Sequence, residues 1–502
     1  MNRRNLLVLI IICVSLLISM ASGLVISPVC TEPGWQQDPE ISGDTIVWQS
    51  DRDTGDLDWD IYMWDPRSGE KRLTFDEDYI QDNPHISGDT IVWRDEKTSC
   101  ISMWDPANPE QQICPESLTN HLAISGDTIV WEDSRDYATT GDDIYKWDPV
   151  NKEQPVCTES GSQNYPAISG DTIVWEDSRD YATNFQDIYM WDPVNKEQPV
   201  CTKPGRQYQP AISGDTIVWF DDRDYANNKS DIYKWDPVNG EQPVCTKPSL
   251  QTNPAISGDI IVWGDDRNLA TTGWDIYMWD PVNGEQPVCT DHGNQLKPAI
   301  SGDIIVWEDD RNWDGVGEPM EWDIYMADLS KTPPIANAGP DQTVIVNEPV
   351  TFDGSGSLDS DGTIVSYAWD FSVPPSGGMK PSHTYTAAGT YTVTLTVTDD
   401  DGLTDSDNVK ITVNTLTKSI QDLRVKVVSL KLPALIEKGL TDKLDASNLQ
   451  INKMQYSAAK QSLTAFTYQV KAQTGKANNL NQATANELIT TAQRIINSIP
   501  KK

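Results

Sequence analysis

Basic residues and histidines are scarce in this chain of 502 residues, and apart from its first 26 residues it has no long apolar run. It carries 38 Lys and Arg against 76 Asp and Glu, so its formal net charge is -38 at pH 7. A field of that sign repels phosphate backbones, which excludes nucleic acid as a partner of the bulk of the chain. The four His, at positions 85, 121, 292 and 383, have no metal-ligand spacing, and no Ser-His-Asp set, Cys-His pair or phosphate-cradling loop is present.

The low hydrophobic content, 38%, is also found in disordered chains. However, 19 Trp and 17 Tyr supply far more large apolar surface than a disordered chain carries. The composition therefore predicts a folded, acidic, β-rich protein, and its length suggests about three domains at ~150 residues each.

The first residues have the pattern of an export signal. Arg3 and Arg4 precede an apolar run over 6–20, and small residues at 19–23 offer a cleavage site. We predict a signal peptide at 1–23 and a secreted, extracellular or cell-surface protein with no membrane span after cleavage. The alternative is an uncleaved anchor, because apolar residues resume at 24–26.

Charge divides the remaining chain into three segments. Residues 24–331 hold 21 Lys and Arg against 60 Asp and Glu, and residues 332–415 hold 2 against 11. Residues 416–502 hold 13 against 5 and have neither Trp nor Cys. These compositional breaks predict three domains with boundaries near 332 and 416.

A repeat determines the expected fold of the first segment. Ile-Ser-Gly-Asp begins at residues 41, 86, 124, 168, 212, 256 and 300, with spacings of 45, 38, 44, 44, 44 and 44 residues. Each copy has four short strand-like runs, which in the fourth copy are 166–168, 172–175, 187–191 and 199–202. Seven such copies predict a seven-bladed β-propeller over 24–331.

The ends of this segment indicate how the ring closes. The seventh copy stops at Lys331 without a fourth strand, whereas Pro-Val-Cys-Thr at 28–31 stands alone and duplicates residues 155–158. We expect strand 28–31 to complete blade seven, because closure removes two exposed sheet edges.

Tryptophans occupy two fixed places per repeat, typified by Trp175 and Trp191, and this regularity is typical of packing between blades. The motifs Ile-Ser-Gly-Asp, Ile-Val-Trp, Asp-Arg-Asp and Asp-Ile-Tyr resemble the TolB-like, WD40-like propeller repeats of secreted bacterial and archaeal proteins.

Six cysteines, at 30, 114, 157, 201, 245 and 289, share one outer-strand position, so they are too far apart to bridge each other and are predicted to be buried. Cys100 lies across a turn from Cys114, so a disulfide between them is possible in an exported protein, with two free thiols as the alternative.

The long loops gather on one face of the expected ring and are the predicted binding face. Carboxylates there can hold Ca²⁺, and aromatic rings can stack on sugars. We assign no cofactor from the sequence, and Ca²⁺ binding by these loops is an open alternative. The alternative is that recurring arginines, such as Arg135 and Arg179, pair with these acids and order the loops. The candidate residues are Asp133, Asp136, Tyr137, Asp177, Asp180, Tyr181, Asp221, Asp224, Tyr225, Asp309 and Trp313.

The second segment alternates apolar residues with Thr over 391–398, which predicts an immunoglobulin-like sandwich. Asn-Ala-Gly-Pro at 337–340, Tyr-Ala-Trp-Asp-Phe at 367–371 and His-Thr-Tyr at 383–385 resemble a PKD domain. This resemblance implies a spacer or adhesion module on a cell-surface protein.

The third segment changes to helical spacing. Leu463, Phe466 and Val470, followed by Leu488 and Ala492, recur at three- and four-residue steps and predict a small α-helical bundle. Thr484 with Glu487 is a candidate helix cap. Runs such as 469–476 resemble the FIMAH module, a helical appendage of secreted hydrolases and archaeal surface proteins.

Taken together, the sequence predicts a mainly β multidomain protein: a seven-bladed propeller, an Ig-like PKD sandwich and a small helical bundle. The architecture resembles methanogen-type archaeal surface proteins. Our first functional prediction is a non-catalytic exported adhesion or scaffold protein whose propeller loops bind a surface polysaccharide or protein. The alternative is a secreted polysaccharide-degrading hydrolase or lyase, because FIMAH modules and TolB-like propellers accompany such enzymes.

Overall fold

The computed structural model describes residues 24–52, 59–75, 79–107, 111–114, 121–312, 321–371, 376–476 and 480–501. The chain forms two compact units, Met1–Lys331 and Thr332–Lys502. The predicted signal peptide lies outside the described residues.

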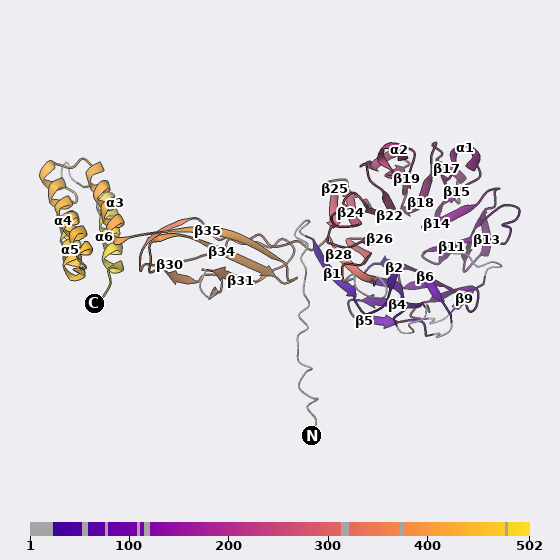
Figure 1. Cartoon of the computed structure of the whole chain (residues 1–502), viewed down its shortest axis with the longest axis horizontal. Helices are drawn as coiled ribbons and strands as arrows, with labels where there is room; N and C mark the ends of the chain where they lie inside the picture. The colour runs from indigo at the N-terminus through magenta and orange to yellow at the C-terminus, as the bar shows by residue number, and fades with distance from the viewer. Residues whose placement is uncertain are drawn as a thin grey trace, which may run out of the picture. The chain divides into compact units, whose positions relative to one another are not determined.

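The described residues of the first unit form seven four-stranded antiparallel sheets, grouped around a common centre (Figure 1). Each sheet is called a blade here and is named by its innermost strand. From the centre outward, three blades are β2 (Gln36–Ser42), β3 (Thr45–Ser50), β4 (Asp60–Asp65), β5 (Gly69–Arg72); β6 (Gln81–Ser87), β7 (Thr90–Asp95), β8 (Cys100–Trp104), β9 (Gln111–Ile113); and β10 (Leu122–Ser125), β11 (Thr128–Asp133), β12 (Asp143–Asp148), β13 (Lys152–Cys157).

The next three blades follow the same order and include two short helices, α1 (Tyr181–Asn184) and α2 (Tyr225–Asn228). Their strands are β14 (Gln163–Ser169), β15 (Thr172–Asp177), β16 (Asp187–Asp192), β17 (Lys196–Cys201); β18 (Gln207–Ser213), β19 (Thr216–Asp221), β20 (Asp231–Asp236), β21 (Gly240–Cys245); and β22 (Gln251–Ser257), β23 (Ile260–Asp265), β24 (Asp275–Asp280), β25 (Gly284–Cys289).

The last blade combines the two ends of the unit. It consists of β26 (Gln295–Ser301), β27 (Ile304–Asp309), β28 (Asp323–Asp328) and, outermost, β1 (Val25–Cys30). Strand β1 pairs antiparallel with β28, with Val25 opposite Asp328. The N-terminal strand is therefore the fourth strand of this blade.

The Ile-Ser-Gly-Asp repeat joins each blade to the next. Gly170 has a φ of 57°, which the tight turn between β14 and β15 requires. Its N–H donates to the Ser125 hydroxyl of the preceding blade at 2.9 Å. The same contact recurs from blade to blade and returns to its start where the Gly43 N–H donates to Ser301 at 2.9 Å. Innermost strands are neighbours in the same order, and β26 lies beside β2, so the ring is closed.

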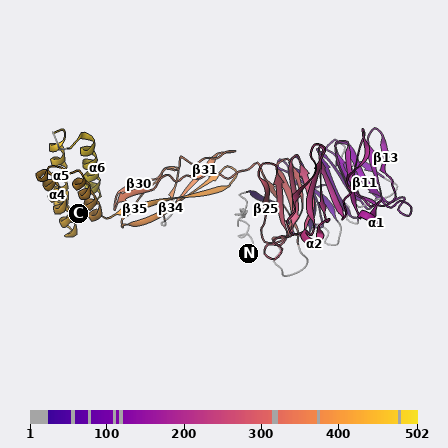
Figure 2. The same cartoon turned by 90° about the horizontal axis from the view of Figure 1, so that it is seen from above.

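The core of the first unit lies between the blades. Trp175 is fully buried and packs with Val130, Ile144 and Cys157 of the preceding blade. The equivalent tryptophans of the other blades are buried in the same way. This confirms the predicted role of these tryptophans in packing between sheets. Figure 2 shows the blades from a second direction.

The second unit begins with a β-sandwich. Its five-stranded sheet has the order β29-β35-β34-β31-β32, and a two-stranded sheet is formed by β30 and β33. Trp369 is fully buried in its core, with its ring 5.2 Å from that of Phe352. The strands are β29 (Gln342–Ile345), β30 (Pro349–Thr351), β31 (Ile364–Asp370), β32 (Ser376–Gly377), β33 (Ser382–Thr384), β34 (Gly389–Asp399) and β35 (Thr404–Asn414).

Four helices complete the second unit: α3 (Leu416–Ser429), α4 (Ala434–Asn452), α5 (Tyr456–Gln473) and α6 (Gln482–Ser498). Leu463, Phe466 and Leu488 lie in their shared core, as the spacing predicts. The predicted cap at Thr484 is wrong. Helix α6 begins earlier, and the Asn481 side chain accepts from the Thr484 N–H at 2.8 Å.

Candidate functional site

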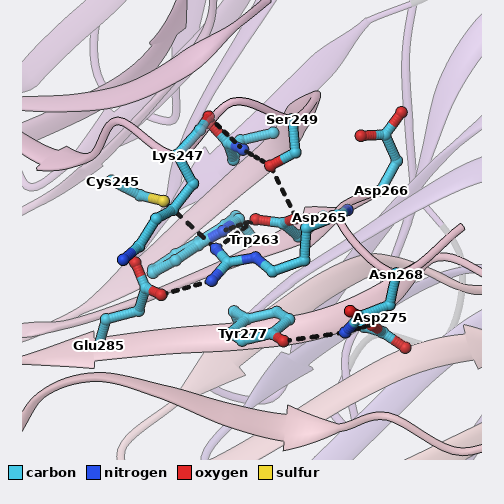
Figure 3. Close-up of polar contacts among 12 residues, drawn as sticks. Cys245, Lys247, Ser249, Trp263, Asp265, Asp266, Asn268, Asp275, Tyr277 and Glu285 are labelled. Atoms are coloured by element: carbon cyan, nitrogen blue, oxygen red, sulfur yellow. Dashed lines mark hydrogen bonds and ion pairs between the residues drawn. The ribbon is translucent and has the colours of Figure 1, made fainter. Parts of the chain in front are cut away.

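A buried polar network recurs in the loop between the second and third strands of most blades. In the β22 blade, Asp265 accepts from the Arg267 backbone N–H at 2.8 Å, from its guanidinium at 2.6 Å and from Trp263 Nε1 at 3.3 Å (Figure 3). The guanidinium also donates to Glu285 and lies 4.0 Å from the ring centre of Tyr277. All of these contacts hold the loop against its own sheet.

The same network contains four residues of the predicted binding face. Their carboxylates are paired with the arginine two positions later and accept from the indole N–H two positions earlier. All four side chains are fully buried, so they lie inside the blades and order the loops, which is the alternative weighed from the sequence. They are Asp133, Asp177, Asp221 and Asp309.

The remaining predicted residues lie at the loop surface. Tyr137, Tyr181 and Tyr225 are exposed, beside Asp136, Asp180 and Asp224. Trp313 lies outside the described residues. The loops therefore present a repeated Asp-Tyr pair in three neighbouring blades.

The described cysteines form one disulfide and five free thiols, an outcome that the sequence left open. Cys100 and Cys114 form a disulfide, with their Cα atoms 4.3 Å apart. Cys30, Cys157 and their equivalents in three further blades are buried free thiols, and burial raises their pKa values. They are packing residues, because a neutral buried thiol is a poor nucleophile.

The sequence pattern did not predict the central channel, which encloses a cavity of about 380 Å³. One repeat position, three residues before the Ile of Ile-Ser-Gly-Asp, supplies one side chain from each blade, and only Asn occurs twice. Where a β-bulge interrupts the pairing, this residue has a positive φ, near 50° at Tyr165. Around the ring the position holds Asp38, Asn83, His121, Tyr165, Gln209, Asn253 and Lys297.

Charged groups lie on one side of this channel. Lys297 Nζ is 2.6 Å from Asp38 Oδ1 and 3.1 Å from Glu308 Oε1. Glu40 Oε1 is 3.6 Å from His85 Nδ1. Burial, with a smaller contribution from the charge of Asp38, raises the pKa of Glu40 to about 8, and burial lowers the pKa of His85 to about 4.

The opposite side is lined by amide groups. The Asn253 amide donates to Gln209 Oε1 at 3.2 Å, and the Gln209 backbone N–H donates to Glu176 at 2.6 Å. Burial raises the pKa of Glu176 to about 7. The channel thus offers amide groups on one side and carboxyl groups that titrate near neutral pH, which is typical of functional sites.

Among the described residues, no three His, Cys, Asp or Glu side chains are grouped so as to hold a metal ion. Within the same ranges, no helix is long and apolar enough to cross a membrane.

Comparison with known proteins identifies the sandwich. Residues 331–413 match the PKD domain family model, so this segment is a PKD domain. The PKD1 domain of the Vibrio cholerae metalloprotease PrtV is 42% identical and covers 16% of this chain and 99% of its own, with a TM-score of 0.15. PKD domains are typical of extracellular proteins.

The first unit resembles propeller domains of peptidases. The β-propeller domain of the Trilobed protease from Pyrococcus furiosus is 15% identical, with a TM-score of 0.42, and the match covers 55% of this chain and 91% of that domain. A puromycin-hydrolyzing peptidase of Mycobacterium tuberculosis is 10% identical, with a TM-score of 0.43, covering 65% of this chain and 64% of the peptidase. This chain therefore spans less than two thirds of the second protein. The curated proteins give no match.

These neighbours correct the functional prediction. They contradict the prediction of a non-catalytic adhesion or scaffold protein and its polysaccharide-degrading alternative, because the matched propellers come from peptidases. At identities of 10–15% the likeness concerns the fold, and no activity of these enzymes is assigned to this chain on that ground.

Proposed function

We propose that this chain is a protease-related protein whose propeller holds a peptide segment in its central channel. The observation that supports this is the channel position itself. Seven blades built on one motif repeat their core and turn residues closely, yet the position that faces the channel holds six different residue types, with Asn alone occurring twice. Packing alone does not require such variety, whereas recognition of an asymmetric ligand does.

A peptide fits the chemistry of the channel. The amides of Gln209 and Asn253 match the donors and acceptors of a peptide backbone. Lys297 and Asp38 offer opposite charges to side chains or chain ends. A volume of about 380 Å³ is in the range of pockets that hold small ligands, enough for a few residues of extended chain.

The test uses a tryptic digest of casein as the probe. The purified chain is immobilised, and bound peptides and newly formed peptide termini are measured by mass spectrometry. We expect the chain to retain peptides and the variant Gln209→Ala/Asn253→Ala to retain at least about fivefold fewer, which is about 1 kcal/mol of binding free energy. Val282→Ala, on an exposed turn that does not line the channel, is the control and should bind as the parent does. Equal retention by the channel variant, or none by the parent, would refute the proposal.

We also infer the finer organisation from the sequence motifs. Each four-stranded sheet is one blade of a seven-bladed, TolB-like propeller that strand 28–31 closes, followed by a PKD domain at 332–415 and a FIMAH-like module at 416–502. Export through a signal peptide at 1–23 and an archaeal source belong to the same proposal. The extracellular occurrence of PKD domains and the Cys100–Cys114 disulfide support export. A surface polysaccharide or protein as partner stays a prediction.

A further inference from the structure

One loop position differs between blades in a way that changes the local charge. It is the residue after the network arginine, at the surface of the loop between the second and third strands. The β22 and β26 blades have Asn there, at 268 and 312. The β10, β14 and β18 blades have Asp instead, at 136, 180 and 224.

Where the residue is Asn, its amide donates to one oxygen of a buried carboxylate. Asn268 Nδ2 donates to Asp275 Oδ2 at 2.8 Å and lies 3.2 Å from the Tyr277 hydroxyl (Figure 3). Asn312 makes the same contacts in its own blade, at 2.7 Å and 2.9 Å. An NH₂ group therefore fills the space between the carboxylate and the tyrosine.

Where the residue is Asp, that partner is missing. Asp187 and Asp231, the equivalents of Asp275, are fully buried, and neither carboxylate has a donor within normal hydrogen-bond geometry, although Asn184 and Asn228 lie close enough to lower their pKa values. Burial, followed by the charges of the adjacent aspartates, raises the pKa of both groups to about 6. A buried carboxylate that faces a second carboxylate is costly unless a positive charge or a proton lies between them.

We propose that these two loops bind a hard divalent cation, Ca²⁺, between Asp180 and Asp187 and between Asp224 and Asp231. Each ion takes the place that the asparagine NH₂ group occupies in the other blades. Two carboxylates supply the charged ligands, and neutral oxygens and water complete the shell of six to eight that Ca²⁺ prefers.

Neutral oxygens are available at both sites. The side chains of Asn184 and Asn228 interact with Asp187 and Asp231 and lower the pKa of these carboxyl groups. Each amide also carries a carbonyl oxygen, which rotation of the amide turns toward a bound ion. The β10 blade is a weaker candidate, because the Thr140 hydroxyl already donates to Asp143 at 3.3 Å.

The test measures the stoichiometry of Ca²⁺ binding to the full chain by isothermal titration calorimetry after chelation. Terbium luminescence, excited through the nearby Tyr189 and Tyr233, serves as a second readout. The variant Asp180→Asn/Asp224→Asn reproduces the arrangement of the β22 and β26 blades, so it is expected to fold. We expect it to bind two ions fewer than the parent.

The reciprocal variant creates a site. Asn268→Asp places a second carboxylate opposite Asp275, so the stoichiometry should rise by one. The proposal is overturned if the double variant binds as many ions as the parent, or if Asn268→Asp adds none. A parent that binds no Ca²⁺ but releases protons near pH 6 would assign a shared proton to these carboxyl pairs instead and would also overturn it.

Discussion

Removing the buried carboxylate of one loop network should destabilise the propeller strongly. In the variant Asp221→Ala, the Trp219 indole loses its acceptor at 3.0 Å, and the Arg223 backbone N–H and Nε lose theirs at 2.9 Å. The guanidinium stays largely buried and keeps only Glu241 as a charged partner. Breaking a buried ion pair by removing one member costs about 3–5 kcal/mol.

The matched control is Glu241→Ala, which removes the outer partner of the same arginine. The Glu241 side chain is 24% exposed, so water replaces part of the lost contact, and we expect a loss of about 1 kcal/mol. Urea unfolding followed by tryptophan fluorescence measures both variants, because every Trp except Trp369 belongs to the first unit. If Asp221→Ala unfolds at the same urea concentration as Glu241→Ala, the network does not stabilise the blade as described.

Three further outcomes are expected. Because the folded-state pKa values of Asp187 and Asp231 are raised to about 6, the folded state binds more protons than the unfolded state between pH 4 and 6. Stability in chelator should therefore fall by roughly 1–2 kcal/mol per group as pH rises through this window, and Asp187→Asn/Asp231→Asn should flatten the profile measured by urea unfolding. Replacing Cys100 and Cys114 by Ser, which opens a loop with a sequence separation of 14, should cost about 3 kcal/mol in denaturation under oxidising conditions; an unchanged midpoint would contradict a stabilising disulfide. Phe466→Ala should cost about 3–5 kcal/mol in helical circular dichroism while the tryptophan transition stays in place.

Much of the fold follows from the repeat, because each motif residue has a repeated structural role. The Ser and Gly of Ile-Ser-Gly-Asp join neighbouring blades, and Gly170 shows the positive φ expected from its hairpin turn. The pairing of β1 with β28 could be predicted, because Pro28–Thr31 duplicates a strand that the last repeat lacks. The start of α6 was less predictable, because Asn and Thr are both good N-caps, so the sequence alone does not select Asn481 over Thr484.

The candidate site was harder to predict for a physical reason. Asp177 and Asp180 are three residues apart in one loop, yet the first is fully buried by Arg179 and the second lies at the surface. The sequence shows an Asp at both positions and does not indicate which of the two pairs with the arginine. The channel residues did carry a signal, since Tyr165 and its equivalents vary at a fixed place in the repeat. A bulge interrupts strand alternation there, so periodicity alone does not indicate the direction of the side chain.

The pairing of Val25 with Asp328 has a consequence for biosynthesis. Roughly 300 residues separate the two strands, and at about 5–20 residues per second the first waits roughly 15–60 s for its partner to be made. Until then β1 has no strand to pair with, and the incomplete ring of blades exposes a free sheet edge. Crowded nascent chains could exchange this strand, and the product would be a domain-swapped dimer in which each molecule supplies the missing strand of the other.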